Sequence, residues 1–448
     1  MTQRSWAWWL PAGGWSSGNQ SHPPTHRPTA TRSINLLLFQ HPPTQPRRGH
    51  LHRFLGALAD ALFSAACPGE EEELLQLLLA SFWCVLPPGD LPFEIMQAQQ
   101  QEAAQQGSAA AAATVAMPHA NVAEIVPSLP LETRWPTLSL RRYAGFWLPE
   151  VTLNDGFPAV HSCFEPRPTD VFLATFPKSG TTWLKALAFA TVKRSQHPPL
   201  AADHPLRHCS PHDCVRFLEI EFNNNTRDEF EALPSPRVLA THFPYTLLHD
   251  GITGSGSGSG CRIVYICRDP KDALVSFWLF TNKVASALGV DTQSFTIQEA
   301  FELFCQGRCP GGPQWHHALQ YWKESVRRPD RVLFLRYEEM LLDPETHLRK
   351  LAKFVGCEFS GEEEEGGVVS AIVELCSLAK MKDMEVNRNG SNNMGLRNES
   401  YFRKGVAGDW SNHMTPEMGQ RLDKIVEDAL EGSGLTFASS APATPPHI

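Results

Sequence analysis

One short segment of the chain, TFPKSGTTW at residues 175–183, carries side chains that could bind an anion. Lys178 supplies an ammonium group, Thr181 and Thr182 supply hydroxyls, and Gly180 allows a tight turn. If a helix begins at this glycine, its first backbone N–H groups also face the ligand from the positive end of the helix dipole. The segment therefore predicts an anion-binding loop.

The position of the lysine distinguishes this loop from a Walker A loop, G-x-x-x-x-G-K-[ST]. In the Walker A loop the lysine directly follows the second glycine and curls over a terminal phosphate. Here Lys178 lies two residues before Gly180. The spacing alone leaves open which anion the loop binds.

The flanking residues predict a strand before the loop and a helix after it. The run VFLA at residues 171–174 is apolar. After the loop, apolar residues recur with helical spacing at Trp183, Leu184, Ala186, Leu187 and Phe189. In the alternative interpretation, Lys178 faces solvent and Thr181 only caps the helix.

A further strand-like run, the third along the chain, continues into YICRDPKDALVSFWLF, which carries Arg268 and Ser276. Ligands of open parallel sheets bind beyond the carboxyl ends of the strands, so we expect Arg268 to face the same crevice as Lys178. A guanidinium at this place suits a second phosphate. The alternative is a surface arginine that pairs with Asp269 or Asp272.

Two other segments add a possible base and two cations. His242 follows the strand-like run in LATHFPY, where a general base could lie, although a lone histidine can also be a packed or surface residue. In YFRKGVAGDW, Arg403 and Lys404 precede Gly405 and Gly408. This pattern predicts either a mobile clamp over an anionic ligand or a basic surface loop.

The order of these segments predicts the fold class. The runs VFLAT, RVLATHF, RIVYICR and RVLFLRY are strand-like, and each precedes a segment with helical periodicity. We therefore expect one three-layer α/β/α domain with a central parallel sheet and a P-loop-like anion loop. Residues 251–260 predict a flexible Gly/Ser loop and residues 361–367 a solvated charge run, neither of them catalytic.

Composition restricts the partners and cofactors. The 448-residue chain has a formal net charge of -9, which argues against general nucleic-acid binding. Its 11 cysteines form no paired framework, as is typical of a reducing compartment. Two groups are close in sequence, Cys209 with His212 and Cys214, and Cys305 with Cys309. Because neither has a second half at zinc-site spacing, no metal site is predicted.

Residues 1–125 differ in composition from the rest and are expected to form an N-terminal extension. Residues 1–59 contain no Asp or Glu, as in disordered or transit-like segments. A short helical segment is expected within residues 51–95, followed by a Gln/Ala-rich linker. The apolar stretch LLQLLLASFWCVL has about 13 residues, too few to cross a bilayer. We find no signal peptide or transmembrane helix, and we expect the α/β domain at residues 126–440.

Three motifs together resemble the soluble sulfotransferases that use 3'-phosphoadenylyl sulfate (PAPS). TFPKSGTTW is similar to the family's 5'-phosphosulfate loop, RDPKDALVS to its 3'-phosphate motif and RKGVAGDW to its C-terminal signature, in the same order. The resemblance covers about residues 130–435, and LETRWPTLSLRRYAGFWLP and TPEMGQRLDKI look most like plant flavonol and steroid sulfotransferases. The resemblance explains why Lys178 precedes Gly180, because the family's loop holds a phosphosulfate and not a triphosphate with magnesium.

The resemblance also implies a role for each motif residue. Lys178 would contact the oxygen that bridges phosphate and sulfate, His242 would be the catalytic base, and Phe280 would line the acceptor pocket. The remaining donor contacts would be Ser179, Gly180, Thr181 and Thr182 to the 5'-phosphate, Trp183, Tyr337 and Ser377 to the adenine, and Arg268, Ser276, Arg403, Lys404 and Gly405 to the 3'-phosphate.

Some positions depart from the family pattern. Ala240 stands where some members have a second lysine, so the leaving group would depend more on Lys178. Cys376 and Leu378 replace a hydroxyl and an aromatic residue of the adenine-contact stretch. The dimerisation motif of animal members is changed at Ser411, Pro416 and Gln420, so a monomer or a weak homodimer is expected.

The expected function is transfer of a sulfuryl group from PAPS to a hydroxyl of a small flavonoid, steroid-like or phenolic acceptor, in the cytoplasm and without a metal or a membrane. A P-loop kinase-like phosphotransferase is the alternative; it would need magnesium and an acidic ligand, for which Asp269 is the nearby candidate. A catalytically inactive nucleotide-binding module would require loss of Lys178 or His242, and both are present.

Overall fold

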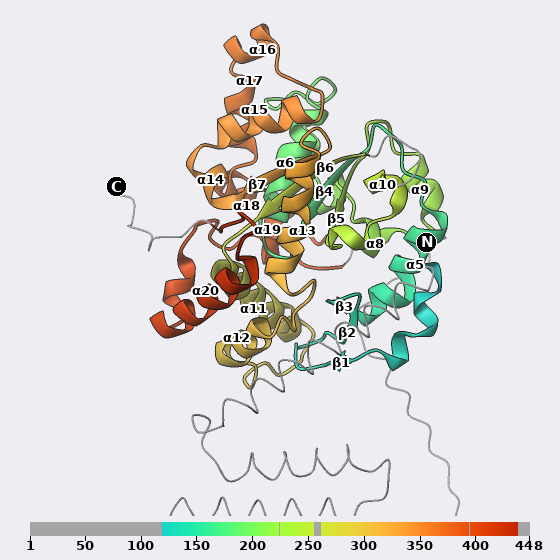
Figure 1. Cartoon of the computed structure of the whole chain (residues 1–448). Helices are drawn as coiled ribbons and strands as arrows, with labels where there is room; N and C mark the ends of the chain where they lie inside the picture. Colours follow the sequence, from blue (N-terminus) through green and yellow to red (C-terminus); the bar gives the residue numbers. More distant parts are fainter. Residues whose placement is uncertain (1–118, 224, 255–260, 394, 438–448) are drawn as a thin grey trace, which may run out of the picture. The chain divides into compact units, whose positions relative to one another are not determined.

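The computed structural model describes residues 119–223, 225–254, 261–393 and 395–437 (Figure 1). Of the predicted N-terminal extension, only the last seven positions fall within this range. The predicted linker, the apolar stretch at residues 74–86 and residues 255–260 of the predicted Gly/Ser loop lie outside the described residues. The loop prediction is wrong for residues 251–253, which belong to the short helix α10 (Asp250–Thr253).

A four-stranded parallel sheet forms the centre of the described domain. It consists of β4 (Val171–Thr175), β5 (Val238–Thr241), β6 (Arg262–Cys267) and β7 (Val332–Arg336), in the order β5-β4-β6-β7. All four lie within the predicted strand-like runs. Ala174 pairs with Thr241 and Thr175 pairs with Ile266, so the segments that follow these strands leave the sheet at one edge.

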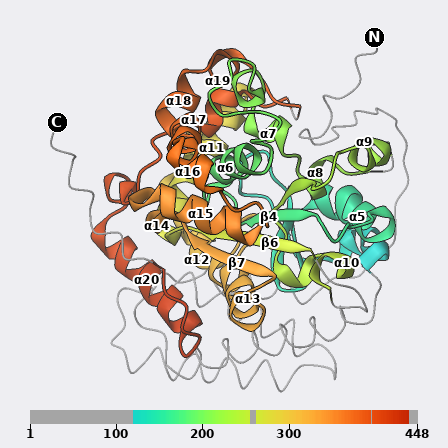
Figure 2. The same ribbon diagram turned by 90° about the horizontal axis from the view of Figure 1, so that it is seen from above.

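The side chains of β4 alternate between two hydrophobic clusters, as expected when successive residues of a strand point to opposite faces. Phe172 and Ala174 belong to one cluster, and Val171 and Leu173 belong to the other. Helices of the first cluster are α5 (Phe157–Cys163), α11 (Pro270–Ala287), α12 (Ile297–Cys305), α13 (Gln314–Arg327) and α20 (Pro416–Leu430). Helices of the second are α6 (Thr181–Val192), α15 (Pro344–Phe354) and α17 (Val368–Leu375). Figure 2 shows α6 and α15 on one side of the sheet and α13 on the other, which confirms the predicted three-layer α/β/α fold.

Shorter elements connect these layers. The α-helices are α7 (Pro211–Cys214), α8 (Leu218–Glu221), α9 (Arg227–Glu231), α10 (Asp250–Thr253), α14 (Tyr337–Leu342), α16 (Gly361–Glu365), α18 (Leu378–Asp383) and α19 (Glu385–Asn389). The 3-10 and π-helical turns are η1 (His119–Glu124), η2 (Val126–Ser128), η3 (Thr152–Gly156), η4 (Pro205–Arg207), η5 (Tyr245–Leu247), η6 (Asn398–Tyr401) and η7 (Asp409–Asn412).

A second, antiparallel sheet was not predicted from the sequence. It contains β1 (Leu131–Glu132), β2 (Leu140–Tyr143) and β3 (Phe146–Pro149) in that order. Ala144 and Gly145, with φ of 48° and 87°, form the two-residue turn between β2 and β3. This hairpin supplies one wall of the pocket described below.

The acidic run at residues 361–367 contains the short helix α16. Ser360 and Glu363 form a capping box at the N-terminus of this helix. Two of its glutamates pair with arginines, Glu363 with Arg194 and Glu364 with Arg349. No residue of α16 is buried, so the run lies at the surface as predicted, and these two side chains form ion pairs there.

The described domain starts earlier than the predicted boundary at residue 126. Val122 in η1 is 1% exposed and Val126 in η2 is 0% exposed, and both belong to the first hydrophobic cluster. A boundary before His119 therefore agrees better with the packing.

We expect a protein that begins at residue 118 to fold, because it keeps the whole described core. Circular dichroism should show a cooperative thermal transition, and a matched protein that begins at residue 127 should melt at a lower temperature because it lacks the buried Val122 and Val126. Burial of a Val side chain contributes about 1.5 to 3 kcal/mol. An insoluble or unfolded protein from residue 118 would contradict the prediction.

Candidate active site

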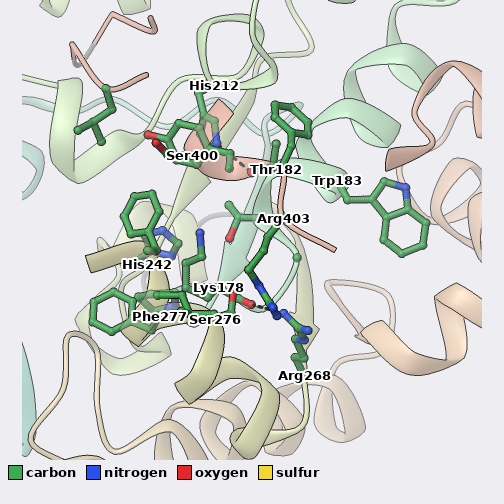
Figure 3. Close-up of a pocket in the computed structure, with 18 of the residues that line it drawn as sticks. Lys178, Thr182, Trp183, His212, His242, Arg268, Ser276, Phe277, Ser400 and Arg403 are labelled. Atoms are coloured by element: carbon green, nitrogen blue, oxygen red, sulfur yellow. Dashed lines mark hydrogen bonds between the residues drawn. The ribbon is translucent and has the colours of Figure 1, made fainter. Parts of the chain in front are cut away.

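The segments that leave the carboxyl edge of the central sheet enclose a pocket of about 710 Å³. Apart from Ser179, every residue that the sequence pointed to as a site residue lines it, namely Lys178, Gly180, Thr181, Thr182, Trp183, His242, Arg268, Ser276, Phe280, Tyr337, Ser377, Arg403, Lys404 and Gly405. Figure 3 shows Lys178 and His242 in one part of the pocket and Trp183 pointing away from them. The structure therefore brings the predicted residues together, while their individual roles stay predictions.

The loop after β4 is held in an unusual backbone conformation. Lys178 has a φ of 66° and Gly180, the N-cap of α6, has a φ of 105°. A Cβ atom on Gly180 would lie 2.8 Å from Cδ2 of Tyr337, so the position accepts no side chain on either ground. The first backbone N–H groups of α6 have no carbonyl within the helix to bond, and they face the pocket from its positive end.

Three buried polar atoms in or next to the pocket lining lack a hydrogen-bond partner within the described residues. They are Nε of Arg268, Oε2 of Glu219 and, in the loop behind the lining, Oγ of Ser179. Buried polar atoms are usually paired, so the unpaired donor of Arg268 in the pocket wall suits a ligand with acceptor oxygens. The donor set of hydroxyl, guanidinium and backbone N–H groups suits a phosphate.

Lys178 lies between this anion loop and an aromatic wall. Its Nζ atom is 3.9 Å from the ring centroid of Phe280. Burial in the first place, together with the positive charges of Arg268 and Arg403, lowers the pKa of Lys178 to about 7. An anion placed in the loop would restore the charge of this lysine.

His242 follows β5 directly, and its ring orientation is fixed. Nδ1 lies 2.8 Å from the carbonyl oxygen of Thr175 and 3.0 Å from its Oγ1. Because a carbonyl can only accept, Nδ1 carries the proton, and Nε2 of the neutral ring keeps a lone pair. Burial lowers the pKa of His242 to about 3, so the imidazole is neutral at pH 7 and can accept a proton.

Two further residues hold the backbone of His242, and sequence reasoning missed both. Oε1 of Glu219 accepts from the backbone N–H of His242 at 2.6 Å, and Nε2 of His317 lies 3.1 Å from its carbonyl oxygen. Burial raises the pKa of Glu219 to about 7. Neither residue belongs to a recognisable motif, so only the fold shows that they meet His242.

The arginine after β6 is buried in the pocket and is not the surface arginine of the alternative interpretation. Arg268 is 6% exposed, and its Nη1 and Nη2 atoms donate to the carbonyl oxygens of Lys178 and Val406. Its Cζ atom is 4.7 Å from the ring centroid of Tyr337. The side chain of Asp272 approaches it only to 3.8 Å.

The segment before η7, which carries Arg403 and Lys404, is hydrogen-bonded to α11 through Asp272. Asp272 accepts from the backbone N–H groups of Gly408 at 2.7 Å and Trp410 at 2.9 Å. Arg403 and Lys404 both pair with Asp409. Figure 3 shows the side chains of Arg268 and Arg403 converging on one part of the pocket. Two anchored segments thus concentrate positive charge at one end of the site.

The residues expected at the adenine adjoin the arginine end of the pocket, because Tyr337 packs against Arg268. The rings of Trp183 and Tyr337 are in edge contact with centroids 5.7 Å apart. Oγ of Ser377 accepts from the backbone N–H of Lys380 and caps α18. Cys376 is 0% exposed and Leu378 lies in the pocket wall. This region offers flat apolar surface for a heterocycle.

The part of the pocket beyond His242 is mostly apolar. Its walls include Leu138, Leu148, Phe243, Phe277 and Val284. Leu148 lies on β3 of the unpredicted antiparallel sheet and Leu138 in the loop between β1 and β2. Phe277 and Val284 lie on α11. The sequence signal for this wall was weak, because only Gly145 of the two turn residues is a usual residue for a hairpin turn. The pocket can therefore hold an apolar compound with its hydroxyl group near His242. A second, anionic molecule could bind next to it at the loop that contains Lys178.

Within the described ranges, no group of three or more His, Cys, Asp or Glu side chains is arranged to hold a metal ion. No helix of the described part is long and apolar enough to cross a membrane.

Comparisons with known proteins agree with this geometry. The profile of the sulfotransferase domain family matches residues 168–434. Cytosolic sulfotransferase 5 of Arabidopsis thaliana is 40% identical over 315 residues, which cover 70% of this chain and 95% of that protein. A crystal structure of an Arabidopsis thaliana protein assigned as a steroid sulphotransferase is 34% identical, with a TM-score of 0.55 over 70% of this chain and 94% of that one.

A mouse sulfotransferase, SULT7A1, was solved in complex with PAP (adenosine 3',5'-bisphosphate). It is 26% identical, with a TM-score of 0.51 over 66% of this chain and 95% of that one. The family profile and the structural similarity extend over most of the described domain. The chain therefore belongs to the sulfotransferase family.

Proposed function

We propose that this protein transfers the sulfuryl group of PAPS to a hydroxyl of a small apolar acceptor, with His242 as the general base. The observation that carries the proposal is the ring of His242, whose Nδ1 is bound to Thr175 so that Nε2 is left to accept a proton in the pocket that also contains Lys178. A base beside a cation and an anion loop is the set of groups that the reaction requires.

The proposed donor fits the polar groups of the pocket. The loop at 178–182 would hold the 5'-phosphate, and Arg268, Ser276, Arg403, Lys404 and Gly405 the 3'-phosphate. The unpaired Nε of Arg268, a residue of the pocket lining, supports an anionic oxygen at this end of the pocket. The mouse relative was solved with PAP bound, which supports the same nucleotide here. When bound, PAPS supplies an activated sulfuryl group.

The residues of this chain would divide the work as follows. Nε2 of His242 takes the proton of the acceptor hydroxyl as its oxygen forms a bond to sulfur. The bond between sulfur and the bridging oxygen breaks, and its electron pair remains on the phosphate. Lys178 and the N–H groups of α6 stabilise that charge. We propose that no metal is needed, because Lys178 supplies the cation.

The acceptor is proposed to be aromatic or steroid-like. Phe280, Phe277 and Phe243 line the pocket, and Phe280 faces Lys178. Flat rings pack well against aromatic walls. The relatives are named cytosolic sulfotransferases, which supports a cytoplasmic location. A monomer or a weak homodimer is proposed on the changed residues Ser411 and Pro416.

The kinase-like alternative is less well supported. Its candidate magnesium ligand, Asp269, is 1% exposed and caps α11, because Oδ1 accepts from the backbone N–H of Lys271 at 2.8 Å. Oδ2 lies 3.5 Å from Nζ of the same lysine. This carboxylate is therefore already used by the helix that follows it.

We expect His242→Ala to lower kcat by about 10² to 10⁴, as loss of a general base does. Affinity for adenosine 3',5'-bisphosphate should stay close to that of the wild type, because His242 has no proposed donor contact. The assay is transfer from PAPS to a phenolic acceptor, with calorimetry for the nucleotide. His208→Ala, at an exposed histidine, is the matched control. Normal turnover of His242→Ala would exclude the proposed base.

We expect binding of adenosine 3',5'-bisphosphate at about pH 8 to take up protons. The pKa of Lys178 is about 7 in the free protein and is raised by the bound anion, so affinity is highest below pH 7 and falls as pH rises above it. Calorimetry in two buffers of different ionisation enthalpy measures the uptake. Lys178→Met should reduce it, whereas Lys323→Met at an exposed position should not. Equal uptake by wild type and Lys178→Met would contradict this assignment.

We expect the protein to prefer adenosine 3',5'-bisphosphate over adenosine 5'-phosphate by roughly 10² or more, because charge-assisted hydrogen bonds to the 3'-phosphate are lost in the second. Arg268→Ala should remove much of this preference. Arg262→Ala, at the opposite end of β6, is the control, since its Nη1 bonds the carbonyl of Val355 outside the pocket. Equal wild-type affinity for the two nucleotides would exclude a 3'-phosphate site.

We expect activity to persist after exhaustive treatment with a chelator. The same assay, with and without added magnesium, checks this. Loss of activity on chelation, restored by magnesium, would favour the phosphotransferase alternative.

A further inference from the structure

A lysine on the inner face of α6 has no place in the mechanism above. Lys185 is 0% exposed, and lysines are rarely buried completely without a partner. Its Nζ atom lies 3.3 Å from the ring centroid of Phe217 and 3.2 Å from Nδ1 of His212. Desolvation of an ammonium group is costly, so a function that needs its charge would explain its position.

His212 connects this lysine to the anion loop. Its Nε2 atom lies 3.0 Å from Oγ1 of Thr182, and Figure 3 shows the two side chains directed toward each other. The ring is 4% exposed and packs between those of Phe217 and Tyr401, with centroids 5.7 Å and 4.1 Å away. The two ring nitrogens therefore face two different partners in a fixed orientation.

The chemistry of these groups gives the chain of hydrogen bonds a direction. An ammonium group has only donors, so Nδ1 of His212 accepts from Lys185. A neutral imidazole then carries its single proton on Nε2, which donates to Oγ1 of Thr182. The hydroxyl of Thr182 has its own proton left over, and this proton is free to point into the pocket.

We propose that Lys185 and His212 are positioning residues that turn the hydroxyl proton of Thr182 toward the 5'-phosphate of the donor nucleotide. The inference rests on the proposed function, because it needs a phosphate in the loop. It assigns a purpose to a buried charge that touches neither donor nor acceptor.

The protonation states agree with this direction. Burial lowers the pKa of His212 well below its usual range, so the ring is neutral. Burial lowers the pKa of Lys185 to about 7, and the carboxylates of Glu221, Glu219 and Asp213 act in the opposite sense. The negative charge of a bound phosphate favours the ammonium form. In the reverse direction Thr182 would donate to His212 and could offer the phosphate only a lone pair, which repels it.

The test is a double-mutant cycle read by calorimetric binding of adenosine 3',5'-bisphosphate. Thr182→Val should weaken binding by about 10-fold or more, as loss of a charge-assisted hydrogen bond does. Lys185→Met should weaken it by a similar factor. In the Thr182→Val background, however, Lys185→Met should change the affinity by less than about 2-fold, because the hydroxyl that the hydrogen-bond relay of Lys185, His212 and Thr182 would orient is already missing.

A pair of substitutions at His212 tests the direction without removing the lysine. His212→Gln keeps an N–H donor for Thr182 and should bind more tightly than His212→Phe, which should match Thr182→Val. Lys193→Met is the control for loss of a lysine near the same helix, since its Nζ bonds the carbonyl of Pro236 at 3.2 Å. Thermal denaturation checks that each variant folds. If Lys185→Met does not fold, the comparison of His212→Gln with His212→Phe still tests the proposal.

The outcomes separate the two proposals. Failure of the wild type to bind the nucleotide would overturn the proposed function. Binding by the wild type with independent, multiplicative effects of Lys185→Met and Thr182→Val would overturn the relay alone. Equal binding by His212→Gln and His212→Phe would do the same.

Discussion

The position of the active site depends on the pairing of β4 with its two neighbours. β4 is hydrogen-bonded on both sides, and its first residues are aligned with β5 by the buried pair of Asp170 and Arg237, which are 0% and 2% exposed. This register makes the anion loop, His242 and Arg268 leave the sheet at one edge. A shift by one residue would turn every side chain of the strand to the other face.

Burial then sets the charges of the groups that this edge collects. The pKa of Lys178 is lowered to about 7 and that of His242 to about 3, each first of all by desolvation. The free pocket thus holds a neutral imidazole and a lysine that is only partly charged. An incoming anion favours the charged form of Lys178. The hydrogen bond from Nδ1 of His242 to the carbonyl oxygen of Thr175 fixes the tautomer, so that the lone pair of the neutral ring stays on Nε2.

Sequence reasoning predicted the central sheet and the site motifs because both are local. The strand before Lys178 and the helix after Gly180 are visible as apolar patterns, and the three motifs are continuous stretches. The antiparallel sheet was missed because its strands are short and its turn at Ala144 uses a residue that is uncommon at positive φ. Glu219, His317 and Lys185 were missed for another reason: each contacts a residue distant from it in sequence, and only the packed fold brings the pair together.

The contact between Gly180 and Tyr337 also has a meaning for protein engineering. The ring of Tyr337, from the segment after β7, fills the space where a side chain of residue 180 would be, and it stacks on Arg268 as well. A residue from a distant part of the chain therefore adds a second requirement for glycine at position 180, beside the positive φ of the loop itself. If TFPKSGTTW were transplanted onto another strand and helix, the loop would lose the ring that packs against its glycine.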